Sequence, residues 1–350
     1  MITYERPPET ATGLRLHQNE NTKGCSPRVL AALASITAER LGCYPPYQAA
    51  TDACARHFNV EPENLILTNG LDAGILAATV AHLRTASAGS VPEAIIPEPA
   101  FEIFEINVAV AGGRAVHVAP RPDFSFAVDA VVGAITANTR LVFVTNPNNP
   151  TGVPVSHSNI RSIARRVPEE ALVLVDEAYV DFSGQSFIPE LDAFPNVVVG
   201  RTFSKAFGLA GLRVGVLVGG RAVLEPIRRA LPVYNVNIAA VVAIQAALQD
   251  LDYIEQYVEQ VNQSRTMLYE ACDRLGLAYW RSAANFVLVK TGDHTAALAR
   301  AAAAAGLSIR SRFKQPGCEG CIRVTTGYVE DTRRFVAVME EALRDPTPDS

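Results

Sequence analysis

Seven short apolar runs, rich in valine, isoleucine and leucine, alternate with alanine-rich helical patterns through the first two thirds of the chain. They occupy residues 65–67, 94–96, 115–118, 141–145, 172–175, 197–199 and 214–218. Short apolar strands separated by helices are typical of βαβ units, whose largely parallel sheet is covered on both faces. The pattern therefore predicts an α/β fold in which ligands bind at the carboxyl ends of the strands.

The character of the sequence changes after residue 235. One helical pattern spans residues 237–275. It is followed by a predicted strand (285–289), a helix (294–305), a strand pair (307–310 and 321–325) and a closing helix (330–343). We expect three parts and a frayed tail after residue 345. They are an N-terminal arm that packs with the small domain (1–30), a large cofactor-binding domain (31–235) and a small C-terminal domain (236–350).

Composition narrows the possible functions. The 350 residues include 31 basic and 36 acidic side chains, a net charge of −5, so we expect no nucleic-acid or membrane partner. Residues 1–9 do not resemble a secretory signal, and no apolar run is long enough to span a membrane. Six scattered cysteines favour reduced thiols and a cytoplasmic location. Cys318 and Cys321 form a CxxC without a second pair or a nearby histidine, so no metal is expected.

A lysine follows the apolar run 197–199 in a setting that suits covalent chemistry. Lys205 is preceded by the hydroxyl groups of Thr202 and Ser204, and Arg213 follows it. A lysine amine can form a covalent bond with an aldehyde cofactor. Hydroxyl groups and an arginine fork suit a phosphate. Taken alone, the segment fits a solvated surface turn equally well.

Polar residues follow two more of the predicted strands. Asp176 ends an apolar strand, where a carboxylate is costly to bury without a cationic partner such as a protonated pyridine nitrogen. The alternative is an aspartate that caps the next helix. The side chain of Tyr179, three residues after Asp176, can reach the same site. Asn149 precedes a proline, which favours extended backbone and projects the amide outward, although asparagine-proline turns are common.

The run 65–67 leads into a glycine turn and the start of a helix. A helix N-terminus offers free N–H groups and a favourable dipole to a phosphate. Gly70, Leu71 and Asp72 are therefore candidate phosphate contacts. On its own, a strand–glycine–helix pattern is weak evidence.

In combination and in this order, the segments resemble fold-type I pyridoxal-5'-phosphate (PLP) enzymes, and among them the histidinol-phosphate aminotransferase-like branch of the class I/II aminotransferases. The resemblance covers nearly the whole chain. It rests on Asn19-Glu20-Asn21, Tyr44-Pro45, Asn149-Pro150-Thr151-Gly152, Asp176-Glu177-Ala178-Tyr179, Ser204-Lys205-Ala206-Phe207, Gly211-Leu212-Arg213 and Gly320-Cys321-Ile322-Arg323-Val324-Thr325.

The resemblance implies roles for these residues. Lys205 would bind PLP covalently and move a proton during the reaction, Asp176 would keep the ring nitrogen protonated, and Asn149 and Tyr179 would bond the ring's phenolate oxygen. Phe101 would lie on the ring face, unless it is simply a core residue. The phosphate would be held by the side chains of Thr202, Ser204 and Arg213 and by the turn at Gly70, Leu71 and Asp72, with backbone amides of the last two.

Tyr44 would reach that phosphate from a second subunit, which implies a homodimer; the alternative is a tyrosine in a surface turn. On the substrate side the resemblance implies that Arg323 binds the α-carboxylate and that Asn19 and Asn149 lie near it. Arg310 would contact an anion at the far end of the substrate. Arg312 and Lys314 are expected to face solvent.

The resemblance implies transamination of histidinol phosphate and imidazole acetol phosphate with 2-oxoglutarate and glutamate, in histidine biosynthesis. Alternatives are an aromatic amino-acid aminotransferase, which would not need Arg310, and a threonine-phosphate decarboxylase, which would release carbon dioxide. A non-catalytic PLP-binding regulator is disfavoured because the chain lacks a basic helical extension. Five residues depart from the family pattern and leave the exact substrate open: His17, Gln18, Thr22, Leu71 and Ala73.

Overall fold

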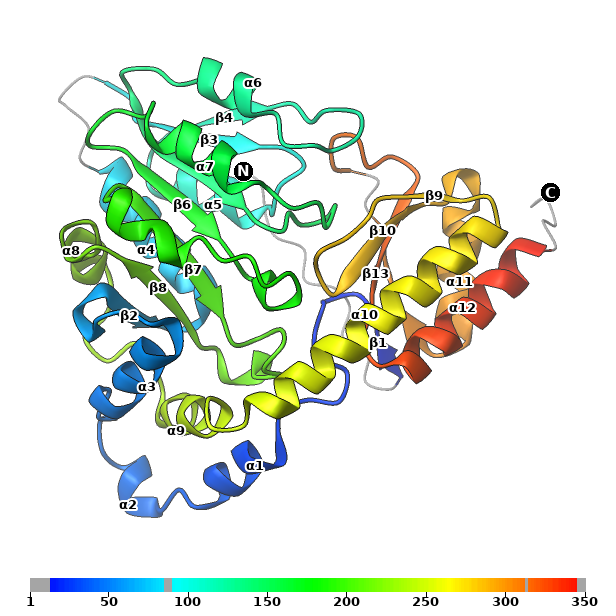
Figure 1. Cartoon of the computed structure of the whole chain (residues 1–350), viewed down its shortest axis with the longest axis horizontal. Helices are drawn as coiled ribbons and strands as arrows, with labels where there is room; N and C mark the ends of the chain where they lie inside the picture. Colours follow the sequence, from blue (N-terminus) through cyan, green and yellow to red (C-terminus); the bar gives the residue numbers. More distant parts are fainter. Residues whose placement is uncertain (1–12, 85–89, 312–313, 345–350) are drawn as a thin grey trace.

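The computed structural model describes residues 13–84, 90–311 and 314–344. The strands are β1 (Leu14–Arg15), β2 (Leu65–Thr68), β3 (Glu93–Pro97), β4 (Arg114–Val118), β5 (Thr139–Thr145), β6 (Leu172–Asp176), β7 (Val197–Thr202), β8 (Gly215–Gly219), β9 (Ala278–Tyr279), β10 (Phe286–Lys290), β11 (Leu307–Ser308), β12 (Arg310–Ser311) and β13 (Cys321–Thr325). The α-helices are α1 (Pro27–Ala34), α2 (Ala38–Leu41), α3 (Gln48–Phe58), α4 (Gly70–Leu83), α5 (Ile103–Val110), α6 (Val128–Gly133), α7 (His157–Ala164), α8 (Arg221–Ala230), α9 (Ile238–Ala247), α10 (Leu251–Arg274), α11 (Thr295–Ala304) and α12 (Val329–Arg344). Figure 1 shows a large sheet and a smaller one, with α10 extending from the large region into the smaller one.

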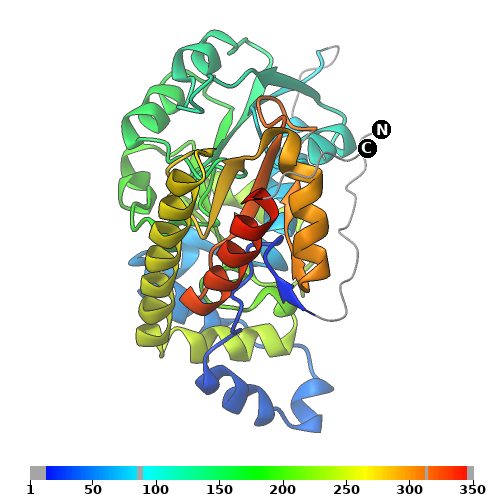
Figure 2. The ribbon, with the colours of Figure 1, turned by 90° about the vertical axis from the view of Figure 1, so that its right-hand side faces the viewer.

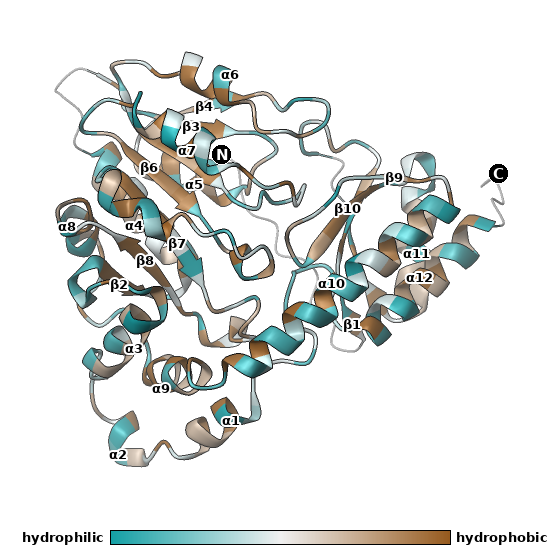
Figure 3. Ribbon diagram, in the orientation of Figure 1, coloured by the Kyte–Doolittle hydropathy of each residue, from teal (hydrophilic) through white to brown (hydrophobic). Residues whose placement is uncertain are grey.

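The large sheet has seven strands in the order β2-β8-β7-β6-β5-β3-β4. Strands β3 to β7 pair in parallel, whereas β8 is antiparallel to both β7 and β2. Every residue of β2, β5, β6, β7 and β8 is buried, and these strands are among the apolar segments in Figure 3. A strand buried on both faces needs apolar side chains at every position, which is why the runs show little polar alternation. The predicted α/β fold with a mainly parallel seven-stranded sheet is confirmed.

The second sheet belongs to the C-terminal part of the chain. Its strands run in the order β12-β13-β10-β9, and all its pairs are antiparallel. Helices α11 and α12, together with the C-terminal half of α10, lie on the side of this sheet that faces away from the large sheet (Figures 1 and 2). The N-terminal segment joins this part, because β1 pairs in parallel with β11 and Leu16 is buried in its apolar core.

Two predicted elements differ from the structure. The helix predicted over residues 237–275 is two helices, α9 and α10, because α9 packs on α1 and α3 while α10 runs on to contact α12. The strand predicted over residues 307–310 is divided into β11 and β12, which pair with β1 and β13 respectively. Tertiary packing, to which local patterns are blind, sets both divisions. Strand β9 was not predicted.

The division into three parts remains a proposal. Most of the buried side chains of α9 and those of Ile254, Tyr257 and Val261 in α10 belong to the apolar core of the large sheet, whereas Leu268 and Cys272 belong to the core of the small one. This packing favours a boundary within α10 over one at residue 235. The predicted tail after residue 345, the first nine residues and Arg312 lie outside the described residues. In the described part of the chain, no helix combines the length and apolar character needed to cross a membrane.

Candidate active site

A cavity of about 430 Å³ opens at the carboxyl ends of three neighbouring strands of the large sheet. Thr145, Asp176 and Thr202, the last residues of β5, β6 and β7, all line it. Parallel strands bring their carboxyl ends to the same edge of the sheet, and ligands of open α/β sheets bind at such an edge. The cavity is also lined from the N-terminal segment by Gln18, Asn19 and Glu20, and from the small sheet by Arg310 and Arg323.

The cavity collects residues that the sequence places far apart. Thirteen of the fifteen predicted site residues line it, and only Gly70 and Tyr44 do not. The thirteen are Asn19, Leu71, Asp72, Phe101, Asn149, Asp176, Tyr179, Thr202, Ser204, Lys205, Arg213, Arg310 and Arg323. The sequence alone did not single out Gln18, Glu20, Thr145, Ala178 or Ala210 as lining residues.

One end of the cavity has the features of a phosphate cradle. Gly70 and Leu71 form the N-terminus of α4, a 14-residue helix whose first amides have no partner within the helix. Gly70 has φ +74°, and a Cβ added there would lie 2.6 Å from Nη2 of Arg213, so only glycine lets the guanidinium lie against the turn. Arg213 donates to Asp72 Oδ2 at 3.0 Å. A phosphate fits this combination of helix N-terminus and guanidinium.

Two hydroxyl groups complete the cradle. Thr202 and Ser204 are both buried, and the Thr202 hydroxyl accepts a hydrogen bond from the Ser204 amide at 3.1 Å. This short turn precedes Lys205 directly. The amine of Lys205 donates to the carbonyl oxygen of Gln18 at 3.0 Å and lies 5.6 Å from the centre of the Tyr179 ring.

Asp176 lies on the floor of the cavity with only 6% of its surface exposed. The pKa of its carboxyl group is raised to about 7, chiefly by burial, although the rise is opposed by the amide of Ala178, which donates to Oδ1 at 3.0 Å, and by the charge of Lys205. A buried carboxyl group that gives up its proton near neutral pH is suited to a cationic partner, and the protonated ring nitrogen of PLP is one. The bond from Ala178 closes a local turn, and the next helical segment, Val180–Phe182, has Tyr179 and not Asp176 at its N-cap, so the alternative of a capping aspartate is not supported.

Tyr179, Asn149 and Arg323 form a chain of hydrogen bonds across the cavity. The Tyr179 hydroxyl accepts from Nδ2 of Asn19 at 3.0 Å and from Nδ2 of Asn149 at 3.4 Å. Arg323 donates from Nη1 to Asn149 Oδ1 and from Nη2 to the carbonyl oxygen of His17 at 2.7 Å. Asn19 was predicted at the substrate, but it is almost fully buried against Tyr179 and Thr325, which favours a role in positioning the tyrosine.

Three consecutive carbonyl groups of the N-terminal segment each accept a hydrogen bond from a different side chain. The carbonyl oxygen of His17 accepts from the Arg323 guanidinium, and that of Gln18 accepts from the Lys205 amine. The carbonyl oxygen of Asn19 accepts from Nδ2 of Asn285 at 3.0 Å. This segment, residues 17–19, therefore ties the lysine of the large sheet to the arginine of the small one. Its backbone contacts left no signal in the sequence, because any residue type supplies a carbonyl group.

Behind the cavity floor lies a buried ionic cluster. Glu177 is fully buried and accepts from the Ser186 hydroxyl and the Phe187 amide, each at 2.6 Å, while Arg201 lies 3.8 Å away and also pairs with Asp181. Because side chains alternate along a strand, Glu177 and Arg201 point away from their neighbours Asp176 and Thr202. The cluster thus fixes the strand ends that carry the cavity residues.

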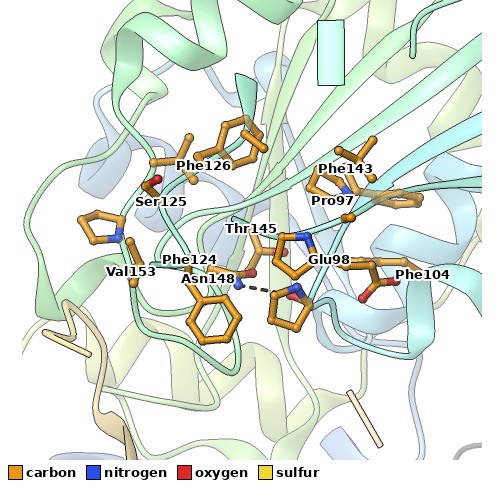
Figure 4. Close-up of a pocket in the computed structure, with 17 residues that line it drawn as sticks. Pro97, Glu98, Phe104, Phe124, Ser125, Phe126, Phe143, Thr145, Asn148 and Val153 are labelled. Atoms are coloured by element: carbon orange, nitrogen blue, oxygen red, sulfur yellow. Dashed lines mark hydrogen bonds between the residues drawn. The ribbon is translucent and has the colours of Figure 1, made fainter. Parts of the chain in front are cut away.

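A second, much smaller cavity of about 30 Å³ lies beside the loop that carries Asn149 (Figure 4). This volume admits no more than a few water molecules, so the cavity is too small for a cofactor. Asn148 lines it and donates from Nδ2 to the carbonyl oxygen of Pro99 at 3.1 Å. The bond anchors the loop, and the small cavity is a packing feature.

Tyr44 lies outside the cavity of its own chain. It is 75% exposed and stacks on Tyr234, with the ring centroids 4.1 Å apart. An exposed tyrosine on the segment between α2 and α3 fits the alternative of a surface turn for an isolated chain. Its predicted reach into a second subunit stays a proposal.

Fold and cavity together define a class of protein, a fold-type I, PLP-dependent transferase: the cavity holds a lysine that could take an aldehyde, a buried carboxyl group suited to a ring nitrogen and a turn suited to a phosphate. The chain belongs to the family of class I and II aminotransferases, whose sequence model matches residues 11–339. The predicted family, the aminotransferase activity and the PLP cofactor are confirmed.

Several relatives are similar over most of their length. Histidinol-phosphate aminotransferase 2 of Carboxydothermus hydrogenoformans is 35% identical over 94% of this chain and 91% of its own. Histidinol-phosphate aminotransferase of Halalkalibacterium halodurans is 34% identical over 95% and 90% respectively. Among solved structures, that of histidinol-phosphate aminotransferase from Sinorhizobium meliloti in complex with pyridoxal-5'-phosphate has a TM-score of 0.85 and 28% identity, and the match covers 95% of this chain and 91% of that one.

Proposed function

We propose that the protein exchanges an amino group between histidinol phosphate and 2-oxoglutarate, in histidine biosynthesis. The observation that carries the proposal is the placement of Arg310 and Arg323 directly opposite each other on β12 and β13, with both side chains lining the cavity. Two guanidinium groups in one cavity suit substrates that carry more than one negative charge. Glutamate carries its charges on two carboxylates, and histidinol phosphate and its keto product carry theirs on the phosphate. The names of the similar enzymes support the same substrate.

PLP, when bound, supplies an aldehyde that takes up the amino group and a ring that accepts electrons from the substrate. The remaining work belongs to the chain. Arg323 would bind the α-carboxylate of glutamate as a bidentate fork, and Asn149 would hold that guanidinium in place. Lys205 would move the proton at the substrate Cα, and Asp176 would hold the proton on the ring nitrogen. Gly70, Leu71, Asp72, Thr202, Ser204 and Arg213 would fix the phosphate, and Phe101 the ring face.

The substrate is tested by spectroscopy with three amino donors. Purified holoenzyme is mixed with histidinol phosphate, phenylalanine or phosphothreonine, and pyridoxamine phosphate is measured. Fast formation with histidinol phosphate supports the proposal, and a preference for phenylalanine would favour an aromatic aminotransferase. Release of carbon dioxide without pyridoxamine phosphate would identify a decarboxylase.

Arg310→Ala is expected to raise KM for histidinol phosphate about 10- to 100-fold, because a charge-assisted hydrogen bond to the distal anion is lost. KM for phenylalanine should change by less than about threefold, since that side chain offers the arginine no anion. Steady-state kinetics with each donor provide the measurement. Arg300→Ala, an exposed arginine on α11, is the control. Equal losses for both donors would rule out recognition of the distal anion.

We also propose a homodimer in which Tyr44 contacts the phosphate bound to the partner subunit. Of nine large apolar side chains exposed in the described residues, five lie on α1, on α2 or close to Tyr44 and its stacking partner. They are Leu30, Leu41, Tyr44, Val233 and Tyr234. Helices α1 and α2 lie at one extremity of the molecule (Figures 1 and 2). Such a cluster is typical of a surface covered by another protein.

Mixed dimers test the shared site. Sedimentation should give about twice the 37.5 kDa chain mass. We expect Tyr44→Ala and Lys205→Ala each to be impaired alone, yet co-refolded mixtures to regain about a quarter of wild-type activity, because one site of each hybrid contains both residues. A monomer, or a mixture no more active than its parents, would contradict a tyrosine shared between subunits.

A further inference from the structure

Glu102 places a carboxylate at the substrate end of the cavity. It immediately follows Phe101, which lines the cavity, and it precedes the first residue of α5. Its Oε2 lies 3.7 Å from Nη2 of Arg310, and 36% of the Glu102 side chain and 19% of the Arg310 side chain are exposed. The pair is accessible to water, so the carboxylate has room to move away from the arginine.

The surroundings explain why a carboxylate is needed there. Arg310 and Arg323 face each other across the β12–β13 ladder, where like charges repel. Both arginines also act electrostatically on His17. The pKa of its imidazole is lowered mainly by burial and by Arg15, and further by the positive charges of Arg310 and Arg323. Arg323 donates to neutral oxygen atoms, those of Asn149 and the His17 backbone. Glu102, by contrast, brings a negative charge to Arg310.

We propose that Glu102 is an exchangeable counter-ion for Arg310 and thereby a specificity-determining residue. With an anionic substrate tail, the tail takes the guanidinium and Glu102 turns to solvent. With an uncharged tail, Glu102 stays, and Arg310 is not left as an unpaired charge beside an apolar group. Binding of an anionic tail is therefore weakened by the free energy needed to separate Glu102 from Arg310, whereas binding of a neutral tail is not. The proposal rests on the proposed role of Arg310 at the substrate tail, and it sets how strongly the site prefers anionic substrates.

Unreactive ligands test this directly. Glutarate carries a second carboxylate in place of a substrate tail, and 3-phenylpropionate carries a neutral ring. Calorimetry on the holoenzyme is expected to show that Glu102→Gln lowers the Kd of glutarate about twofold to fivefold, the range of a solvent-accessible ion pair. The Kd of 3-phenylpropionate should stay the same or rise. The KM of glutamate should fall in parallel with the Kd of glutarate.

Two further variants separate this proposal from its alternatives. Glu105→Gln removes the same charge one turn along α5, where that carboxylate lies 3.7 Å from His117, and it should leave both ligands unaffected. In an Arg310→Met background, Glu102→Gln should no longer strengthen glutarate binding. If the gain persists there, Glu102 acts by general repulsion and the counter-ion role is wrong; weaker glutarate binding in Glu102→Gln alone would also overturn it. Failure of histidinol phosphate as a donor would refute the proposed function and leave the glutarate result standing.

Discussion

Lys205→Ala is expected to abolish covalent attachment of PLP and to lower kcat by at least about 10²- to 10⁴-fold, the usual contribution of one positioned proton-transfer group. The amine lies in the cavity beside Tyr179 and the Gln18 carbonyl, and no other lysine lines that cavity in the described residues. Noncovalent binding of PLP should persist, because the cradle formed by Gly70 and Arg213 remains intact.

Mass spectrometry after borohydride reduction measures the attachment. In the wild type, the cofactor mass should remain on the peptide that contains residue 205, whereas in Lys205→Ala it should be absent. Lys290→Ala, at the exposed end of β10, serves as the control and should keep both attachment and turnover. A Lys205→Ala protein that still carries reducible cofactor and turns over normally would refute the assignment of the lysine.

Asp176→Asn is expected to make the cofactor-free protein more stable and the enzyme far less active. The carboxyl group has a pKa of about 7 in the folded protein, against an ordinary value of 3.8, because it is buried. A folded-state pKa that is raised means that folding is penalised progressively as pH rises from about 4 to about 7, and the penalty is complete above that range. Asparagine avoids the penalty, so the free energy of unfolding at pH 8 should rise by roughly 2 to 4 kcal/mol.

The loss of function has the same origin. Without the carboxylate, the ring nitrogen of PLP has no anionic partner, and kcat should fall about 10²- to 10³-fold, as for the removal of one preorganised electrostatic group. Thermal unfolding of apo and holo forms at pH 5 and pH 8 measures the stability. The gain should shrink toward pH 5, and PLP should stabilise the variant less than the wild type. Asp192→Asn, an exposed aspartate, is the control; an apo variant that is less stable than the wild type at pH 8 would contradict a buried, costly carboxylate.

The sequence predicted the large sheet well and the small domain less well, for a physical reason. A strand buried on both faces leaves a continuous apolar run, so strands β2 to β8 could all be predicted from the sequence. Strands β1, β9, β11 and β12 have two residues each, too few to leave a periodic pattern. The end of α9 is set by the helices it packs on, because its own residues favour continuation of the helix.

The candidate site, too, could be predicted from the sequence only in part. Residues that must be one particular type, such as Lys205, Asp176 and Gly70, were predicted from motifs in which that type has a chemical reason. Contacts that depend on the meeting of distant segments were not. The pairing of Glu102 with Arg310 joins two parts of the chain that only the folded protein brings together. The Gln18 carbonyl on Lys205 is another such contact.

The carbonyl contacts of residues 17–19 also bear on how the protein is made. His17 bonds Arg323 and Asn19 bonds Thr325, each across 306 positions of the chain. On the ribosome, the segment at residues 17–19 must therefore wait for the β13 segment, synthesised about 300 residues later, before these hydrogen bonds can form. A nascent chain that stops short of β13 can complete the large sheet, yet it still lacks the arginine and the threonine that hold this segment against the lysine. A chain truncated before β13 is therefore expected to lack a complete active site even where its large sheet has formed.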